Sequence, residues 1–169
     1  MSAAADIALP PLVHERPEDA AAVERLVMRA FGPGRFAKAA ERLRERRTPA
    51  PDLSFVAWSG GEAVGSVRQW SVTIGGRPAI LLGPFAVDEA WRSQGLGAAL
   101  IQRACRAAAD AGHALIVLVG DEPYFGPMGF SAGPASRVQM PGPVDQRRVL
   151  VCALVPGADQ GLSGPVEPA

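Results

Sequence analysis

Apolar residues recur every three or four positions in two early stretches of the chain, which is the spacing of an amphipathic helix. The first stretch, Pro17 to Ala30, opens with a proline and two acidic residues that favour a helix start. The second runs from Arg35 to Glu45, and we expect its Arg and Glu side chains to form a solvated face. An alanine-rich stretch from Gly95 to Ala111 predicts a third helix, and Glu122 to Gly126 a short helical turn.

Runs of β-branched and apolar residues predict strands between and after these helices. Leu53–Trp58, Ala63–Ile74 and Ala79–Val87 are separated by short glycine-rich links, which favour an antiparallel meander. Ala114–Val119 follows a helix, so a crossover should make it parallel to Ala79–Val87. Shorter extended segments are expected at Leu12–Arg16, Ser136–Met140 and Arg148–Val155. The order of elements predicts a mixed α/β domain without internal repeats.

Length and composition favour one domain. The chain has 169 residues, of which 48% are hydrophobic, enough for one substantial core. We expect the domain to span residues 11–157. The segments 1–10 and 158–169 are rich in Gly, Pro and small residues and are expected to be flexible tails.

Charge and composition argue against several classes of function. The chain has 17 basic residues (Lys and Arg) and 17 acidic residues (Asp and Glu). No net charge therefore favours binding to nucleic acid or to a membrane surface. The absence of a signal-like start and of a long apolar run predicts a cytoplasmic location. The two histidines, His14 and His113, lack clustered partners, which predicts no metal site. Cys105 and Cys152 are expected to be small buried side chains.

The junction before the third long helix has the features of a phosphate-binding turn. Arg92 precedes Gly95 and Gly97, whose lack of a Cβ lets backbone N–H groups face an anion at the positive end of a helix. A dinucleotide-binding motif would require a further small residue where Leu100 stands, and the lysine of a P-loop is missing. A tight strand-to-helix turn without a ligand is the simpler alternative.

A second signal lies inside the third strand of the meander. Pro84 cannot donate a ladder hydrogen bond, so Gly83-Pro84 predicts a bulge or a separation from the neighbouring strand. Parted strands leave backbone groups free for a ligand.

The pattern Arg92-x-x-Gly95-x-Gly97 resembles the R/Q-x-x-G-x-G/A acyl-coenzyme-A motif of the GCN5-related N-acetyltransferases (GNAT family). The segments FGPGRFAKAAERLRE, LGPFAVDEAWRSQGLG and GDEPYFGPMGF are similar to a bacterial group of predicted acetyltransferases, the YhbS-like proteins, and the resemblance spans about residues 11–157. It implies a mixed, mostly antiparallel sheet of six to seven strands, with a splayed central parallel pair, about four flanking helices and a C-terminal hairpin.

The resemblance also implies the residues that bind acetyl-CoA. Backbone N–H groups at the helix start would hold the pyrophosphate, and the backbone of the third meander strand would hold the pantetheine arm, with the Phe85 N–H polarising the thioester carbonyl. The implied contacts are Phe85, Ala86, Val87, Arg92, Ser93, Gln94, Gly95, Leu96, Gly97 and Ala98.

Catalytic groups are less clearly indicated. In the family pattern Tyr-x-x-x-Gly-Phe the tyrosine protonates the leaving thiolate, but Phe125 occupies that position and Tyr124 precedes it. Tyr124 is therefore either the general acid or a packed or rim side chain. Asp121 and Glu62 are candidate bases, with N-capping as an alternative role for Asp121 and a water chain as an alternative base. Residues 68–70, Arg-Gln-Trp, are expected either to line the acceptor side or to alternate in exposure.

The resemblance implies an acetyl-CoA-dependent N-acetyltransferase that acts in a ternary complex on a small-molecule or peptide amine, without a metal. The alternative is a non-catalytic acyl-CoA-binding sensor or regulatory module of the same fold. The acceptor is not specified by the sequence, and either a monomer or a homodimer is expected, since the C-terminal strand of such folds pairs within or between subunits.

Overall fold

The computed structural model describes residues 8–32, 34 and 38–169. Eight strands form one connected sheet, in which β1-β2-β3-β4-β5-β7 are neighbours in that order, β8 extends the edge of β3, and β6 pairs with β8. All of the pairs are antiparallel except β4 with β5 and β6 with β8. The predicted mixed α/β class is confirmed, with one strand more than the largest number expected.

The elements agree with the sequence pattern over most of the chain. The first long helix begins one turn later than predicted, since Pro17–Asp19 forms a 3₁₀ turn before it. The α-helices of the described residues are α1 (Ala20–Phe31), α2 (Leu96–Asp110) and α3 (Glu122–Phe125). The strands are β1 (Leu12–His14), β2 (Phe55–Ser59), β3 (Glu62–Ile74), β4 (Arg77–Val87), β5 (Leu115–Val119), β6 (Val138–Gln139), β7 (Val149–Ala153) and β8 (Gly164–Pro168).

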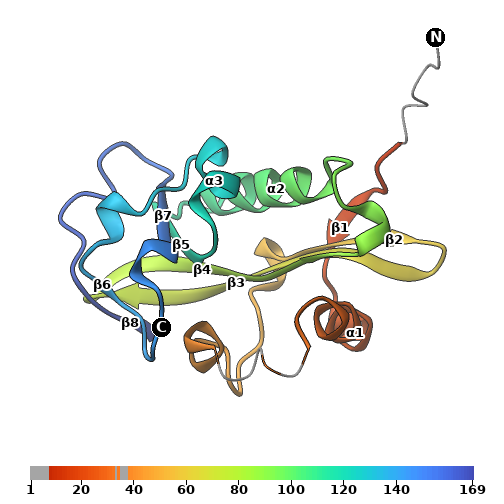
Figure 1. Ribbon diagram of the computed structural model, residues 1–169, viewed down its shortest axis with the longest axis horizontal. Helices are drawn as coiled ribbons and strands as arrows, with labels where there is room; N and C mark the ends of the chain where they lie inside the picture. Colours follow the sequence, from red (N-terminus) through yellow and green to blue (C-terminus); the bar gives the residue numbers. More distant parts are fainter. Residues whose placement is uncertain (1–7, 33, 35–37) are drawn as a thin grey trace, which may run out of the picture.

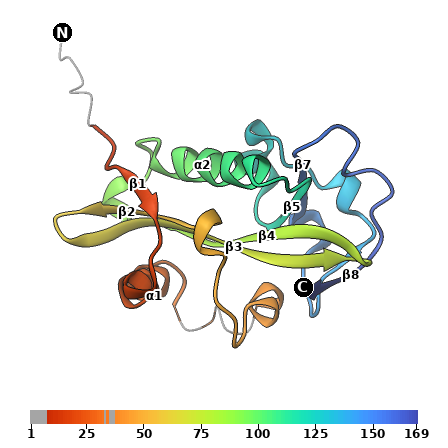
Figure 2. The ribbon, with the colours of Figure 1, turned by 180° about the vertical axis from the view of Figure 1, so that it is seen from behind.

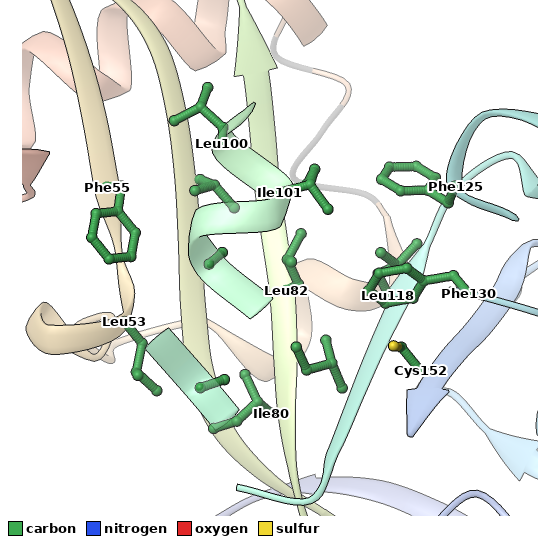
Figure 3. Packing of buried hydrophobic residues seen from close by; sticks show 14 of the residues in the cluster. Leu53, Phe55, Ile80, Leu82, Leu100, Ile101, Leu118, Phe125, Phe130 and Cys152 are labelled. Atoms are coloured by element: carbon green, nitrogen blue, oxygen red, sulfur yellow. The ribbon is translucent and has the colours of Figure 1, made fainter. Parts of the chain in front are cut away.

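Helices cover both faces of the sheet (Figures 1 and 2). On one face, Leu100 and Ile101 of α2 pack over Ile80 and Leu82 of β4 (Figure 3). On the other face lie α1 and a short 3₁₀ segment, Ala39–Leu43, which we call the 39–43 turn. Residues 79–82 of β4 and 115–118 of β5 alternate between the two cores, so both strands are apolar where they pair, as buried parallel strands require.

The second predicted helix is wrong in type and extent. Its first residues, 35–37, lie outside the described residues, and from residue 39 the chain forms only the 39–43 turn. Its Ala, Glu, Leu and Arg residues are good helix formers, so the packing of Ala39 and Leu43 against the sheet overrides local helix propensity here. Because the 39–43 turn is a 3₁₀ segment and not an α-helix, the described residues contain three α-helices where about four were expected.

The expected C-terminal hairpin and C-terminal tail are also wrong. Instead of pairing with each other, β6 pairs with β8 and β7 pairs with β5. In place of a flexible tail at 158–169, Gly164–Pro168 forms β8 and pairs with Val72–Ile74 of β3. β3 extends beyond the end of β2, and β8 satisfies this otherwise open edge while burying Val166. The expected N-terminal tail, 1–10, lies largely outside the described residues.

Among the described residues, no helix combines the length and apolar character needed to cross a membrane.

Candidate acyl-coenzyme A site

β4 and β5 pair over a short ladder and then separate. The ladder joins Ile80 to Ile116 and Leu81 to Val117, although β4 continues to Val87. A cavity of about 720 Å³ opens beyond this ladder. Its walls include residues 82–87 from β4 and 118–121 from the end of β5. The predicted splay is confirmed, and it leaves room for a ligand between the strand ends.

A bulge in β4 accompanies the separation. Between two paired positions, β3 has Arg68 alone, whereas β4 has both Gly83 and Pro84. Pro84 has no N–H to continue a ladder, and its peptide bond with Gly83 is cis. The indole Nε1 of Trp70 donates a hydrogen bond of 2.5 Å to the Gly83 carbonyl. The predicted bulge is therefore present, and a buried tryptophan holds its backbone.

The predicted phosphate-binding turn lies at one end of this cavity. Gly95 is the N-cap of α2 with φ of +90°, a conformation that favours glycine, and Ser93 also has a positive φ of 64°. The first N–H groups of a helix have no intrahelical acceptor, so those of α2 are available to an anion. The Arg92 guanidinium currently donates through Nε to the Val87 carbonyl at 3.2 Å.

Six of the ten residues expected to contact CoA line the cavity. The lining group is Phe85, Ala86, Val87, Arg92, Ser93 and Gly97. The other four, Gln94, Gly95, Leu96 and Ala98, do not line it; Leu96 is buried in the core, and the Gln94 side chain donates to the Ala90 carbonyl.

Gly97 is in close contact with two aromatic side chains of the cavity wall. A Cβ atom at residue 97 would lie 2.5 Å from the Tyr124 hydroxyl oxygen and 3.1 Å from Cζ of Phe85. The rings of Phe85 and Tyr124 are stacked with centroids 6.3 Å apart. The Tyr124 side chain is 47% exposed, and its partial burial raises the pKa of the phenol. The Tyr124 hydroxyl is thus a neutral donor inside the cavity.

The neighbouring Phe125 is packed in the core, although it also lines part of the cavity wall. Its ring is 8% exposed, packs edge to face against Phe130 and closely contacts Gly120. One position along a helix rotates a side chain by about 100°, which places Phe125 in the core and Tyr124 over the helix start of α2. The structure therefore brings Tyr124 to the site.

Asp121 also lines the cavity, at the carboxyl end of β5. Its carboxylate accepts a hydrogen bond of 3.2 Å from Nε of Arg148 and makes no side-chain cap to α3. The expected capping alternative is therefore wrong for the side chain, since the backbone carbonyl of Asp121 receives the N–H groups of Tyr124 and Phe125 instead. Glu62, the other candidate base, lies at the exposed start of β3 and does not line the cavity.

The opposite wall contains residues that the sequence did not indicate. Lys38 and Arg44, at the two ends of the 39–43 turn, line the cavity together with Phe31 and Val144. Arg44 is only 9% exposed and pairs with Glu41 at 3.0 Å, so the expectation of a fully solvated charged face is wrong here. No sequence signal distinguishes Arg44 from its neighbouring arginines, because its burial depends on contacts with the sheet.

Residues 68–70 of β3 are structural, and neither expectation for them holds. All three are buried. Arg68 pairs with Glu15 of the β1–α1 connection and with Glu24 of α1, each at 2.6 Å. Gln69 donates to two buried backbone carbonyls, and Trp70 supports the β4 bulge.

The cysteines do not belong to the cavity lining. Cys152 is buried, as expected, whereas Cys105 is only partly buried. Burial, with a smaller contribution from Cys152, raises the pKa of Cys105 to about 12, so its thiolate is not populated near neutral pH. No cluster of metal-ligating side chains is found in the described part of the chain.

Comparison with known proteins agrees with this geometry. The model of the acetyltransferase (GNAT) family matches residues 20–124, which include the splayed strands, the α2 start and Tyr124. This chain belongs to the GNAT acetyltransferase family. It is therefore an acyltransferase by descent, and the GNAT fold expected from the sequence is confirmed.

GNAT relatives of known structure hold the expected ligand. The chain is 30% identical over 163 residues to the uncharacterized N-acetyltransferase YhbS of Escherichia coli K12, covering 90% of this chain and 92% of that protein. The crystal structure of E. coli YhbS in complex with CoA superposes with a TM-score of 0.80 at 28% identity, over 96% of this chain and 92% of that one. A GNAT acetyltransferase from Brucella melitensis in complex with acetyl-CoA gives a TM-score of 0.69 at 25% identity, over 94% of this chain and 95% of that one.

Proposed function

We propose that this protein transfers an acetyl group from acetyl-CoA directly to an amine while both substrates are bound. One observation carries the proposal: a single cavity is lined by the α2 start, by the parted backbone of β4 and by the Tyr124 side chain. The CoA and acetyl-CoA complexes of two similar GNAT structures support the choice of donor.

The pyrophosphate of CoA would bind the backbone N–H groups of residues 93–98. Arg92 lies beside this turn and would add a charge-assisted hydrogen bond after leaving the Val87 carbonyl. A single helix terminus contributes only about 0.3–2 kcal/mol, so several N–H groups and Arg92 must act together.

The pantetheine arm would lie along Phe85, Ala86 and Val87, which line the cavity beyond the end of the β4–β5 ladder. The Phe85 N–H is the donor that we assign to the thioester carbonyl. A backbone donor held by a sheet stabilises the developing oxyanion without reorganising. The Phe85 side chain has a packing role, against Tyr124 and Phe125.

In the transfer step, the amine nitrogen forms a bond with the acetyl carbon and the carbon–sulfur bond breaks. The leaving sulfur takes the phenolic proton of Tyr124, which solvent then restores. The raised pKa of Tyr124 keeps that proton in place at neutral pH. Attack by Cys105 as a covalent nucleophile is disfavoured, because Cys105 lies outside the cavity lining and its pKa is raised to about 12.

The acceptor amine must first lose a proton. An alkyl ammonium with a pKa of about 10.4 costs about 4.6 kcal/mol to neutralise at pH 7. Asp121 lines the cavity, and its side chain is 74% exposed. We assign to its carboxylate the attraction of the ammonium and the passage of its proton to adjoining water.

The deciding experiment is titration of acetyl-CoA into the purified protein, followed by a thiol-release assay across a panel of amines. Micromolar binding with thiol release that increases when an amine is added supports the enzyme. Binding without release for any amine favours the sensor alternative. No binding of CoA contradicts the assignment of the α2 start.

A further inference from the structure

We infer that the acetyl acceptor carries a carboxylate one or two carbons from its reacting amine, and that Arg44 and Lys38 bind this carboxylate. The inference rests on the proposed function, because it names the substrate class of the same cavity. Both cations flank the 39–43 turn and line the cavity from the face of the sheet opposite α2.

Arg44 supplies a fixed, directional donor. Its side chain is 9% exposed, and Nη2 donates to Oε2 of Glu41 at 3.0 Å, which restrains the planar guanidinium. Nη1 lies 3.1 Å from the position that a Cβ would occupy at Gly83, directly beside the β4 bulge. A guanidinium presents its donors as a flat fork that matches a carboxylate. The Arg44 fork is therefore placed where the two central strands part.

Lys38 supplies net positive charge at the same wall. Its ammonium lies 4.8 Å from the centroid of the exposed Phe31 ring, and none of the ion pairs between described residues includes it. The other charges of this end are paired: Asp121 with Arg148, Asp145 with Arg147, and Arg44 with Glu41. Among the residues that the structure describes, the acceptor end of the cavity thus has one cation in excess, which favours an anionic group on the ligand.

The spacing along β4 selects the distance between amine and carboxylate. Gly83 precedes Phe85 by two residues, so their Cα atoms lie at most about 7 Å apart, and the Arg44 fork beside Gly83 lies at most about 12 Å from the assigned oxyanion donor. Hydrogen bonds of about 2.8 Å at each end leave at most about 6 Å between the carboxylate and the thioester oxygen, which is room for one or two carbons between the carboxylate and the attacking nitrogen. The same cations disfavour the ammonium form of that nitrogen and so promote its attack.

Apolar residues line the cavity beside these cations, namely Ala30, Phe31, Pro143 and Val144. An apolar substituent on the acceptor would bury against these side chains at about 25 cal/mol for each Å². The chemical class is therefore a free amino acid, α or β, with an apolar side chain.

The test compares free amino acids with matched compounds that lack the carboxylate, such as leucine with leucinamide and with 3-methylbutylamine. Amine-dependent thiol release should give a kcat/KM at least about tenfold higher for the amino acid than for either analogue. Arg44→Lys keeps the charge beside Glu41 but removes the fork, and Lys38→Gln changes an exposed side chain. Each should remove that preference, whereas Arg106→Gln, an exposed cation of α2 outside the cavity, should keep it.

Binding separates this inference from the proposed transfer. Amino acids are titrated into protein saturated with CoA, and each variant is first checked for its melting temperature and its CoA affinity. Binding of amino acids that is lost in Lys38→Gln, without thiol release, supports the carboxylate site and contradicts the transfer. Equal binding and equal turnover of amino acids and their analogues overturns the carboxylate site, as does a preference for aminoalkyl phosphonates over the matched amino acids.

Discussion

The Tyr124 hydroxyl oxygen lies 2.5 Å from the point where a Cβ on residue 97 would stand. Two separate parts of the chain therefore meet at one spot: the second residue of α2 and the short helix that follows β5. Only a glycine at position 97 allows the tyrosine to occupy its present place. The relationship links the proposed phosphate-binding turn to the proposed proton donor.

Replacing Gly97 with valine should weaken acetyl-CoA binding by about tenfold or more, because the new side chain would fill the cavity end and displace Tyr124. Isothermal titration measures the dissociation constant. The melting temperature should change little, since valine has a higher helix propensity than glycine and the Tyr124 ring is half-exposed. Ala109→Val, on an exposed position of α2, is the matched control. Unchanged affinity in Gly97→Val would contradict the assignment of this turn.

Tyr124→Phe should lower kcat by about tenfold to a hundredfold and leave the dissociation constant of acetyl-CoA unchanged, since only the proton donor is removed. Because burial raises the pKa of Tyr124, the rate in the wild-type protein should not decline through ionisation of this phenol below about pH 10. A pH–rate profile of the two proteins measures both effects. An unaltered kcat would assign Tyr124 to packing.

Asp121→Asn should lower kcat/KM for the amine by about tenfold at pH 7, since the variant retains the shape but not the charge of the side chain. Stability should change by less than about 1 kcal/mol, because the Asp121–Arg148 pair is exposed. Asp110→Asn, at the exposed end of α2, is the control for a lost surface charge. If kcat/KM is the same in both variants, water alone removes the proton.

Asp19 should make stability depend on pH. Side-chain hydrogen bonds from Arg16 lower the pKa of Asp19 below its ordinary value of 3.8, and its carboxylate also accepts the Arg16 backbone N–H at 2.8 Å. A lowered pKa contributes stability that is present above the unfolded value and is lost as the pH falls through the folded value. The melting temperature of Asp19→Asn should therefore lie below that of the wild type at pH 6, and the difference should diminish below about pH 4. A difference that does not vary with pH would refute this origin.

Val166→Asp should destabilise the protein by about 3 kcal/mol or more, because it places a charge in the core at a position of β8 that is 2% exposed. Glu167→Gln, at the adjacent exposed position, should change stability by no more than about 0.5 kcal/mol. Chemical denaturation measures both. Similar stabilities for the two variants would show that β8 contributes nothing to the fold.

Local patterns in the sequence determined much of the fold. The helical spacing of apolar residues predicts α1 and α2, and the runs of β-branched residues predict β2 to β5, because both signals depend on contacts within a few positions. The Gly83-Pro84 pair predicts the bulge for an equally local reason, the missing N–H of proline. Gly95 and Gly97 likewise mark the start of α2.

The tertiary structure alone decided which distant segments meet. β6 pairs with β8 rather than with β7, because β8 takes the open edge of β3 and so lies within reach of β6. Tyr124 enters the cavity because Phe125 fills the core beside Phe130. Arg44 lies in the cavity wall because the 39–43 turn packs on the sheet. Such contacts join residues far apart in the chain, and their free energy depends on burial and shape that no short stretch of sequence encodes.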